Sequence, residues 1–415
     1  MAEVEPLRAV HYDVARAGPL AGLVAPPYDV IDAPRRALLA AASPYNVVEI
    51  DLPAGADPYA RAGELYAHWQ ADGVLVRDAE PALWAHEQVY RGPDGERRIR
   101  RGFFGRVRVQ EYGPGRVRPH ERTHPGPRED RLRLTRATAA NLSPIFALYS
   151  DPPGAALSAL APAMREPPWG EVTDADGTVH RLWRCGDGAA IAEVSNALAG
   201  AELLIADGHH RYETARVYAD EVGGEGEHRY VLTCLVALED PGLSIFPTHR
   251  LVGGLDADRR AALDAAIERD FAAEPANRDE PAPAPGDGPL ELGYLDAQRA
   301  LRLRLRDQSI ADRALAAMPE PYRRLDTGVL EALLLKRALG LSDDDISHLH
   351  GLGYARDAAQ AREEIDAGRY DAAFLMRPTP VALVREIAAA GVNMPPKSTY
   401  FFPKLLTGLL FNPLG

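Results

Sequence analysis

The chain has 415 residues, 46% hydrophobic and 26% charged, which is the composition of a globular protein long enough for two or three domains or one elaborated α/β domain. Its net charge of -13 argues against a surface that coats nucleic acid, so any anionic ligand should bind in a local basic pocket. No stretch approaches the roughly 18 apolar residues of a membrane span, and we expect a cytoplasmic protein. Only Cys185 and Cys234 occur, without a Cys-x-x-Cys spacing, so neither a disulfide framework nor a structural zinc site is indicated.

The first expected elements follow the chain in order: an extended segment at 25–31, a helix at 35–42, a strand at 46–52 and a helix at 58–71. The prolines of the extended segment exclude a helix there, so this segment runs towards the helix that follows it. Tyr28 and Asp29 in this segment have no obvious role in a core. Glu49 interrupts the apolar strand, where an outward-facing residue is favoured.

A hairpin and a polar loop are expected next. Strands at 82–90 and 98–109 flank the sequence GPDG, in which Gly95 supplies the positive φ of the turn. The hairpin leads into a loop at 116–131 that is polar and punctuated by proline and glycine. Such a loop cannot lie in a core.

Several residues whose side chains can take part in binding or catalysis lie in this loop. His120, Glu121 and Thr123 belong to the sequence HERT, and a connection of this length needs neither a second histidine nor an acid. A functional role is therefore favoured over a plain connection. A helix at 132–140 follows, packed by its leucines.

The centre of the chain is expected to contain a strand at 143–149, a helix, a hairpin and a second helix over 155–200, a strand at 203–206 and a helix at 209–221. The strand at 203–206 is short and wholly apolar, so we expect it to be central in the sheet and buried on both faces. The helix that follows carries Ala215, Tyr218 and Val222 on one face.

The densest polar cluster lies where that strand meets that helix. Asp207 and Gly208 form the turn, and His209, His210 and Arg211 open the helix. The backbone N–H groups of a helix start lack intrahelical partners and favour a phosphate or carboxylate, a preference that imidazoles and a guanidinium strengthen. Capping by Asp207 and core packing of His210 and Tyr212 as hydrogen-bonded polar side chains are the structural alternatives. Burying so many ionisable groups together is costly, so a functional cluster is favoured.

The second half of the chain begins with strands at 231–238 and 243–252 and a helix at 256–271. His249 lies near the middle of the second strand, where a hydrogen-bonded structural histidine and a functional one are equally expected. A proline-rich stretch at 281–285 indicates an exposed, flexible or extended connection. We therefore expect a domain boundary or a surface excursion there, with one α/β domain at 1–272 and a further α/β part at 289–415.

The C-terminal part alternates strands at 290–294, 301–305 and 372–376 with helices at 310–317, 327–338, 358–367 and 381–389. The aspartates at 343–345 indicate a solvated acidic helix start rather than a metal site. The tail at 394–404 is stiffened by proline, and its Lys397, Thr399 and Lys404 suit a phosphate clamp. A C-terminal strap packed by the aromatic residues of this tail is equally expected.

Common nucleotide-binding and hydrolytic motifs are absent from the sequence. It contains no Walker loop, no G-x-G-x-x-G after a strand, no H-E-x-x-H on a helix and no G-x-S-x-G elbow. What remains is a set of anion-binding donors, carboxylates and hydroxyls. Phosphoryl transfer needs that mixture of groups.

Several sequence blocks resemble one prokaryotic family, the domain of unknown function 1015 family, almost from end to end. The blocks are IADGHHRYETA at 205–215, APPYDVI at 25–31, NVVE at 46–49, HERT at 120–123, NLSPIF at 141–146, PTHR at 247–250 and PKSTY at 396–400.

The sequence DGHHR at 207–211 is also similar to the second box of ParB/sulfiredoxin-like domains, in the form that free serine kinases carry. The sequence PHE at 119–121 then stands for the first box, whose glutamate is the base of those kinases. This resemblance implies an α/β fold with a mixed sheet and flanking helices. Such a fold elaborates a ParB/sulfiredoxin-like core and adds a C-terminal α/β part.

The resemblance implies a phosphotransferase that acts on a small hydroxyl metabolite, serine or a related amino acid first, with ATP or ADP as co-substrate and Mg²⁺ as cofactor. In this hypothesis Glu121 is the base and Asp207 orients it or binds the metal. His209, His210 and Arg211 hold the transferred phosphate. Glu121 and Asp207 should then share one cleft, within about 12 Å. Further phosphate- or nucleotide-binding residues are expected at Gly208, Thr123, His120, His249, Lys397 and Thr399.

Three other functions fit the same residues: hydrolysis of a phosphomonoester such as phosphoserine, a non-enzymatic nucleotide-gated module like ParB, and a zinc hydrolase that uses His120, His124, His209 and His210. The acidic chain and the pair of histidines count against the ParB-like module. The expected partners are a small-molecule substrate and a nucleotide, and neither a nucleic acid nor a membrane. The sequence leaves the oligomeric state open.

Overall fold

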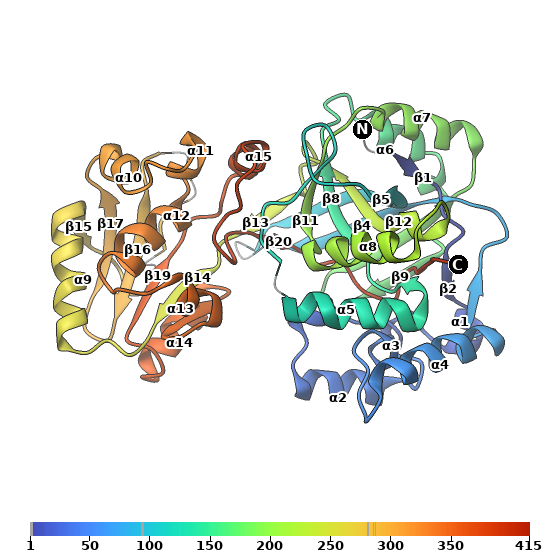
Figure 1. The fold of residues 1–415 in the computed structure, drawn as a ribbon, viewed down its shortest axis with the longest axis horizontal. Helices are drawn as coiled ribbons and strands as arrows, with labels where there is room; N and C mark the ends of the chain where they lie inside the picture. Colours follow the sequence, from blue (N-terminus) through green and yellow to red (C-terminus); the bar gives the residue numbers. More distant parts are fainter. Residues whose placement is uncertain (1–2, 93–94, 124, 280–281, 285, 287) are drawn as a thin grey trace. The chain divides into compact units, whose positions relative to one another are not determined.

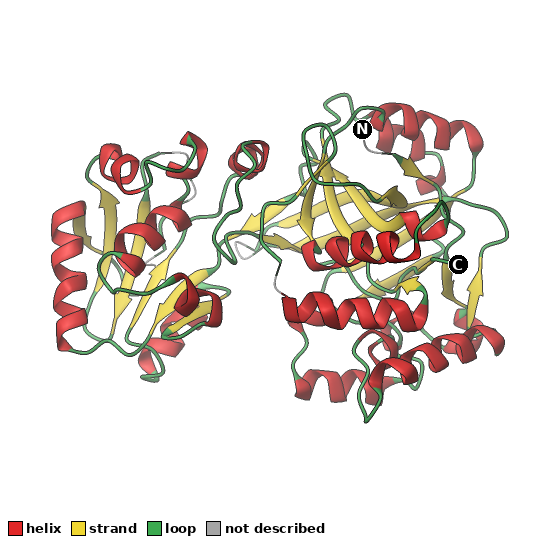
Figure 2. Cartoon of the chain, in the orientation of Figure 1, coloured by secondary structure: helices red, strands yellow, loops and turns green. Residues whose placement is uncertain are grey.

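The structure is a computed structural model that describes residues 3–92, 95–123, 125–279, 282–284, 286 and 288–415. The chain forms two compact units, one made of Met1–Leu243 with Pro403–Gly415 and the other of Ser244–Phe402. Each unit combines a mixed or antiparallel sheet with helices (Figures 1 and 2). The expected α/β class, with a mixed sheet and flanking helices, is confirmed.

The division between the units differs from the boundary expected at the proline-rich stretch. Helix α9 (Ala257–Asp270) runs directly into strand β15 (Phe271–Pro275), which pairs with β17 (Ala300–Leu305). Segments before and after the prolines therefore belong to one sheet. Within the stretch Pro283 is buried and Ala284 is exposed, while positions 281 and 285 lie outside the described residues.

The first unit is built on a nine-stranded sheet in the order β6-β11-β8-β12-β5-β4-β10-β9, with β1 added on β5. Its strands are β1 (Val4–Glu5), β4 (Leu83–Arg91), β5 (Arg97–Arg108), β6 (Val117–Arg118), β8 (Ile145–Tyr149), β9 (Gly170–Thr173), β10 (Val179–Cys185), β11 (Leu203–Asp207) and β12 (Tyr230–Ala237). Two short ribbons accompany the sheet: β2 (Val10–Tyr12) with β3 (Leu75–Arg77), and β7 (Ala140–Asn141) with β21 (Asn412–Pro413).

The hairpin β4–β5 forms as expected. The strands pair in antiparallel register from Arg91 opposite Arg97 to Trp84 opposite Phe104. Gly95 has a φ of 76°, which favours glycine because a side chain is strained there. Positions 93 and 94 of the turn lie outside the described residues.

Strand β11 is buried on both faces, as expected. Its Leu203, Leu204 and Ile205 are at most 4% exposed. The expectation that it is central in the sheet is wrong, because only the two-residue strand β6 lies beyond it. Antiparallel pairing with β8 on the other side aligns Leu204 with Leu148. Strand β11 therefore lies next to the edge strand of the sheet.

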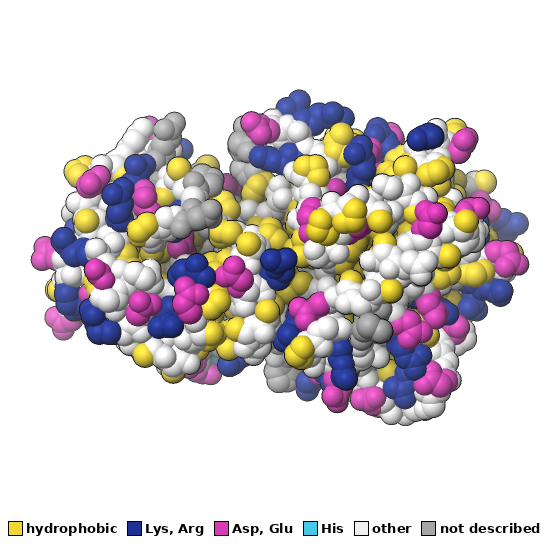
Figure 3. Space-filling model, turned by 90° about the horizontal axis from the view of Figure 1, so that it is seen from above, with side chains coloured by type: hydrophobic (Ala, Val, Ile, Leu, Met, Phe, Trp, Pro, Cys, Tyr) yellow, Lys and Arg dark blue, Asp and Glu magenta, His cyan; other side chains and the backbone are white. Residues whose placement is uncertain are grey.

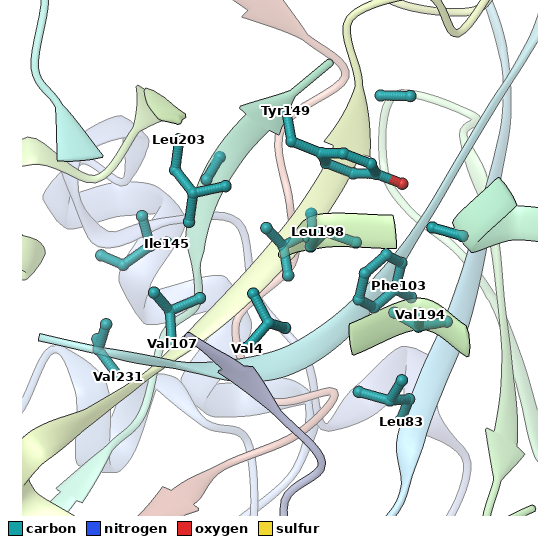
Figure 4. Close-up of a cluster of buried hydrophobic side chains, with 14 of the residues drawn as sticks. Val4, Leu83, Phe103, Val107, Ile145, Tyr149, Val194, Leu198, Leu203 and Val231 are labelled. Carbon is teal, nitrogen blue, oxygen red and sulfur yellow. The ribbon is translucent and has the colours of Figure 1, made fainter. Parts of the chain in front are cut away.

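Eight helices are described in the first unit: α1 (Val14–Ala17), α2 (Ala33–Ala42), α3 (Val48–Asp51), α4 (Pro58–Ala71), α5 (Pro125–Thr138), α6 (Ala155–Leu160), α7 (Gly188–Leu198) and α8 (His209–Val222). Helices α5 and α8 lie side by side, and α4 packs against α5 (Figure 1). Figure 4 shows how the strands and α7 meet in the core, through Leu83, Phe103, Val107, Ile145, Val194, Leu198, Leu203 and Val231. This core anchors the end of β11 and the start of α8.

The strand expected at 46–52 is instead the short helix α3. Asn46 is fully buried, and its side-chain amide donates to the carbonyls of Gly22 and Val24 while its oxygen accepts the N–H of Val48. This side chain turns the backbone at the point where an apolar pattern predicted extension. Glu49 then pairs with Arg36 and Arg61, at 3.3 and 2.9 Å.

Helix α8 begins and ends close to its expected limits, but its buried face differs. His209, Tyr212, Ala215 and Ala219 are the buried residues along this face, whereas Val222 is 51% exposed. Tyr212 is 2% exposed and its hydroxyl donates to the carbonyl of Gln110, which matches the structural alternative for this residue, although the apolar pattern did not place it on the buried face. Helix α5 likewise starts earlier than expected, at Pro125, because proline suits the first turn of a helix.

The second unit is built on an antiparallel six-stranded sheet in the order β15-β17-β16-β19-β14-β18, and a two-stranded ribbon joins β13 to β20. Its remaining strands are β13 (Ser244–Phe246), β14 (His249–Val252), β16 (Glu291–Asp296), β18 (Leu352–Ala355), β19 (Ala372–Leu375) and β20 (Tyr400–Phe402). Its helices are α9, α10 (Gln308–Ala314), α11 (Glu320–Arg323), α12 (Asp326–Leu330) with the π-helical turn η5 (Glu331–Lys336), α13 (Asp343–His348), α14 (Ala358–Asp366) and α15 (Val381–Ala389).

Helices cover both faces of this sheet. Phe374 of β19 packs with residues of α9, α12 and η5, whereas the adjacent Ala373 and Leu375 pack with α14. Successive side chains of this one strand therefore pack into two different hydrophobic cores, one on each face of the sheet. The single strand expected at 243–252 is two strands, β13 and β14, since Pro247 lies between them and has no N–H to donate to a ladder. The aspartates at 343–345 form an acidic helix start capped by Ser342, as expected.

Lys and Arg side chains are interspersed with Asp and Glu over the visible face of the molecule (Figure 3). Exposed side chains of opposite charge form pairs, such as Arg136 with Glu221. Among the described helices, none is long and apolar enough to cross a membrane.

Candidate functional site

The start of α8 presents backbone N–H groups beside Asp207. Gly208 has a φ of 97°, and a Cβ atom there would lie 3.1 Å from both the Arg211 Nε and the Ile145 Cδ1. A glycine is therefore required at this turn. Among the described residues no side chain caps the helix, so the alternative that Asp207 is its cap is wrong. The positive end of the helix remains directed towards the polar cluster.

Two cations hold the carboxylate of Asp207. Lys404 donates to one carboxylate oxygen and Arg211 to the other, and Arg211 also donates to the carbonyl of Pro144. Burial alone would raise the pKa of Asp207, but the charges of Lys404 and Arg211 outweigh burial and hold the pKa far below its ordinary value. Asp207 is therefore ionised over the whole physiological range.

A chain of hydrogen bonds orders two histidines next to this cluster. His120 Nδ1 donates to the carbonyl of Ile205 at 2.8 Å, and the backbone N–H of His120 donates to Nε2 of His209 at 3.3 Å. The two rings meet edge to face, with centroids 4.6 Å apart. Because Nε2 of His209 accepts, its proton lies on Nδ1, which is 4.0 Å from a carboxylate oxygen of Glu121.

Both histidines are neutral at pH 7. Burial lowers the pKa of His209 well below its ordinary value, although the charge of Asp207 opposes this shift. Burial also lowers the pKa of His120, while the carboxylates of Glu121 and Asp207 partly oppose this shift. Both carboxylates therefore act on one buried imidazole.

Lys404 is the residue of this cluster that the sequence analysis placed elsewhere, in a tail clamp with Lys397. It lies 197 positions from Asp207, so no local pattern connects the two. The chain has only three lysines, Lys336, Lys397 and Lys404, among 47 basic residues. That scarcity is the one compositional feature of the sequence that sets Lys404 apart.

A buried pair in the first sheet holds the backbone of Lys404. Arg100 of β5 donates to the carbonyl of Pro403 and to Gln88 of β4, and Gln88 donates to the carbonyl of Lys404 at 3.1 Å. Arg100 is 1% exposed, and burial lowers its pKa to about 10, so it stays charged at pH 7. The sheet interior therefore determines where Lys404 meets Asp207.

Replacing Arg100 by methionine is expected to lower the free energy of unfolding by about 2–4 kcal/mol, because the carbonyl of Pro403 and the oxygen of Gln88 lose a buried donor. Urea unfolding measures this change. Arg97→Met, on the exposed part of the same strand, is the control and should change stability by less than about 0.5 kcal/mol. Equal effects of the two substitutions would contradict the role of Arg100.

A second polar network adjoins Arg211. Asp51 is 4% exposed, and Arg131 and Ser143 both donate to it, at 3.2 Å. The guanidinium of Arg131 lies over the ring of Tyr28, 4.2 Å from its centroid. A cavity of about 40 Å³, the size of a water molecule, lies between this network and Arg211. Tyr28 therefore has a packing role that the sequence did not indicate.

The first unit gathers most of the expected site residues. Asp207, Gly208, His209, His210 and Arg211 adjoin one another at the β11–α8 turn, and His120 and Glu121 reach them from the loop before α5. Thr123 is half-buried in the same loop, and His124 lies outside the described residues.

The other expected site residues belong to the second unit. Lys397 is exposed and has a φ of 56°, whereas Thr399 and His249 are buried. His249 Nδ1 accepts the backbone N–H of Met376 at 3.0 Å. This bond matches the structural alternative for His249.

His249 makes the stability of the second unit depend on pH. Burial and the charge of Arg250 lower its pKa to about 4, whereas an unfolded histidine titrates near 6.5. Below pH 6.5 the unfolded chain binds a proton that the folded chain does not, so stability falls as the pH falls from about 6.5 towards 4. At pH 5 the loss is about 2 kcal/mol.

His249→Asn keeps an acceptor for Met376 and removes the titration. The variant should lose less stability than the wild type between pH 7.5 and pH 5 in urea unfolding. The comparison isolates His249 because the other buried histidines are unchanged. The same pH slope in both proteins would contradict this account.

The donors at Asp207 do not fit a metal site. Both carboxylate oxygens accept from cations, and among the described residues no group of three His, Cys, Asp or Glu could hold a metal ion. The expectation of a Mg²⁺ ligand at Asp207 therefore stays a prediction that these contacts do not support. The zinc alternative likewise stays a prediction without support here, because Nδ1 of His120 and Nε2 of His209 already bond to the backbone and His124 lies outside the described residues.

Distant solved structures resemble the chain. A free serine kinase in complex with AMP is 13% identical, over 71% of this chain and 88% of its own, with a TM-score of 0.36. SbnI from Staphylococcus aureus with a C-terminal truncation is 10% identical, over 73% and 85%, with a TM-score of 0.38. A conserved hypothetical protein from Pyrococcus furiosus is 13% identical, over 71% and 92%, with a TM-score of 0.35.

None of the curated proteins matches the chain. The family described as "Protein of unknown function (DUF1015)" matches residues 4–328, which include the whole polar cluster except Lys404. This match covers more than half of the chain, so the protein belongs to the DUF1015 family.

Proposed function

We propose that the first unit is a phosphotransferase that moves a phosphoryl group from a nucleotide to a small hydroxyl metabolite. The observation that carries this proposal is the pairing of Asp207 with Lys404 and Arg211 at an uncapped helix start, beside Glu121. The sequence resemblance to free serine kinases makes serine the first substrate to test, with ATP or ADP as donor.

The cations supply what phosphoryl transfer needs most. Negative charge spreads over the equatorial oxygens of the transferred group, and fixed positive groups stabilise it. Lys404, Arg211 and the N–H groups of the first turn of α8 provide these charges. Asp207 holds the two cations in place before the substrate binds, so they need little rearrangement when it does.

Glu121 is the proposed base. Its carboxylate is 28% exposed, and the Nδ1–H of neutral His209 points towards it from 4.0 Å. The substrate oxygen attacks the phosphorus, the bond from phosphorus to the leaving nucleotide oxygen breaks, and Glu121 takes the hydroxyl proton. His210, half-buried on the first turn of α8, adds a donor for the phosphate oxygens.

Arg211→Lys keeps the positive charge but loses the fork that donates to both Asp207 and Pro144. We expect the affinity for ATP or ADP to fall at least about tenfold while the protein still folds. A thermal-shift titration measures this, since a ligand that binds only the folded state raises the melting temperature.

Arg216→Lys is the matched control. Arg216 lies on the same helix, pairs with Glu213 at 3.0 Å and is similarly shielded. It should leave nucleotide affinity unchanged. An Arg211→Lys protein that binds nucleotides as well as the wild type would remove Arg211 from the phosphate site.

A further inference from the structure

The second unit contains a cavity that is independent of the Asp207 cluster. Its volume is about 370 Å³, within the range of small-ligand sites, and it lies between α11, α12, the start of α15 and the residues just before β16. Every residue that lines it belongs to the second unit. We call it the Arg323 cavity.

The charges on the wall of the Arg323 cavity do not balance. Arg377 makes a bidentate pair with Asp326, at 2.8 and 2.9 Å, and both side chains are nearly buried. Arg324 pairs with Glu386 at 3.1 Å and also with Glu320, which does not line the cavity, at 2.9 Å. The pairs that Arg377 and Arg324 make include both carboxylates that line the cavity. The third guanidinium, that of Arg323, therefore has no carboxylate partner among the lining residues.

Arg323 has a buried donor without an acceptor. Its Nε is shielded from solvent and makes no hydrogen bond among the described residues. The nearest carboxylate, on Asp312, lies 3.8 Å from Nη1, too far for a hydrogen bond, and does not line the cavity. The side chain of Arg323 is 28% exposed, so a ligand that supplies an acceptor to its accessible nitrogens would complete the pairing of this guanidinium.

Most of the remaining lining is apolar. Leu325, Val329 and Leu383 line the cavity with several prolines, and Gln308 and Thr379 are the uncharged polar side chains among the lining residues. A ligand that fills this volume therefore needs an apolar body as well as one anionic group.

We propose that the Arg323 cavity binds a small organic anion, with its carboxylate or phosphate on Arg323 and its apolar part against Leu325, Val329 and Leu383. This site takes no part in the phosphoryl transfer proposed for the first unit. It stands on the three guanidiniums and two carboxylates of the wall, the weakly paired guanidinium of Arg323 and the largely apolar remainder of the lining.

Calorimetric titration of the full chain with four probes tests the proposal. Phenylacetate, phenyl phosphate, 2-phenylethanol and phenethylamine share a benzene ring and differ in the charge and type of polar group. At least one of the two anions should bind, and ten times or more tighter than the alcohol or the amine. The comparison of phenylacetate with phenyl phosphate decides which anionic group the site prefers.

Two substitutions connect the binding to this cavity. Arg323→Gln should lower the affinity for the preferred anion at least tenfold, and Leu383→Trp should abolish binding by filling the cavity. Arg313→Gln removes the same charge from an exposed position on α10 and should have no effect. Melting curves confirm that each variant folds.

Three results would overturn the proposal: no binding of either anion, equal binding of phenylacetate and phenethylamine, or equal effects of Arg323→Gln and Arg313→Gln. Binding that Arg211→Lys removes and Arg323→Gln does not would also overturn it, because the anion would then occupy the Asp207 cluster. Failure of the proposed phosphotransferase activity would leave all of these binding results unaffected.

Discussion

Replacing Lys404 by methionine is expected to lower the rate of nucleotide-dependent phosphoryl transfer by about 10³-fold. Methionine nearly keeps the length of the side chain but removes the cation that binds Asp207. The loss should appear in kcat measured with saturating nucleotide. The fold should survive because Asp207 keeps its bond with Arg211.

Two further lysine substitutions supply the controls for this prediction. Lys397→Met changes an exposed lysine of the second unit and should leave kcat unchanged. Lys404→Arg keeps the charge and should restore part of the activity. A Lys404→Met protein with a kcat near that of the wild type would show that this cation takes no part in the reaction.

Replacing Glu121 by glutamine should lower kcat by about 10²–10⁴-fold while leaving the nucleotide dissociation constant unchanged. The amide keeps the shape of the carboxylate next to Nδ1 of His209 but no longer accepts a proton. Single-turnover kinetics combined with a nucleotide titration separates the two quantities.

Glu129→Gln is the control for Glu121. Glu129 is an exposed residue of α5 that pairs with Arg133, so its replacement should change neither quantity. If Glu121→Gln weakened nucleotide binding and left kcat intact, Glu121 would be a binding residue and the proton acceptor would lie elsewhere.

Local patterns predicted the β11–α8 turn well. An apolar run, a turn and a helix start are all encoded within residues 203–215, and each is confirmed, with Gly208 at a positive φ in the turn. The buried face of α8 was mistaken because Tyr212 buries its ring while its hydroxyl reaches Gln110. Amphipathic residues of this kind escape a two-class hydrophobic pattern.

Contacts between segments that are far apart in the chain could not be predicted from the sequence. The helix α3 replaces an expected strand because Asn46 bonds to Gly22 and Val24, more than twenty positions earlier. Lys404 reaches Asp207 only because Arg100 and Gln88 hold the backbone before it. No local pattern encodes such a contact, although the scarcity of lysine distinguishes Lys404.

The most direct test of the central proposal is ³¹P NMR of the purified full chain with L-serine and either ATP or ADP. Phosphoryl transfer predicts a new phosphomonoester resonance that grows as the nucleotide loses its terminal phosphate, and that is lost in Lys404→Met and Glu121→Gln. Phosphomonoester hydrolysis would instead convert added phosphoserine to inorganic phosphate without a nucleotide. If no phosphomonoester forms from serine or from other small hydroxyl metabolites with either nucleotide, the Asp207 cluster is not a phosphotransferase site.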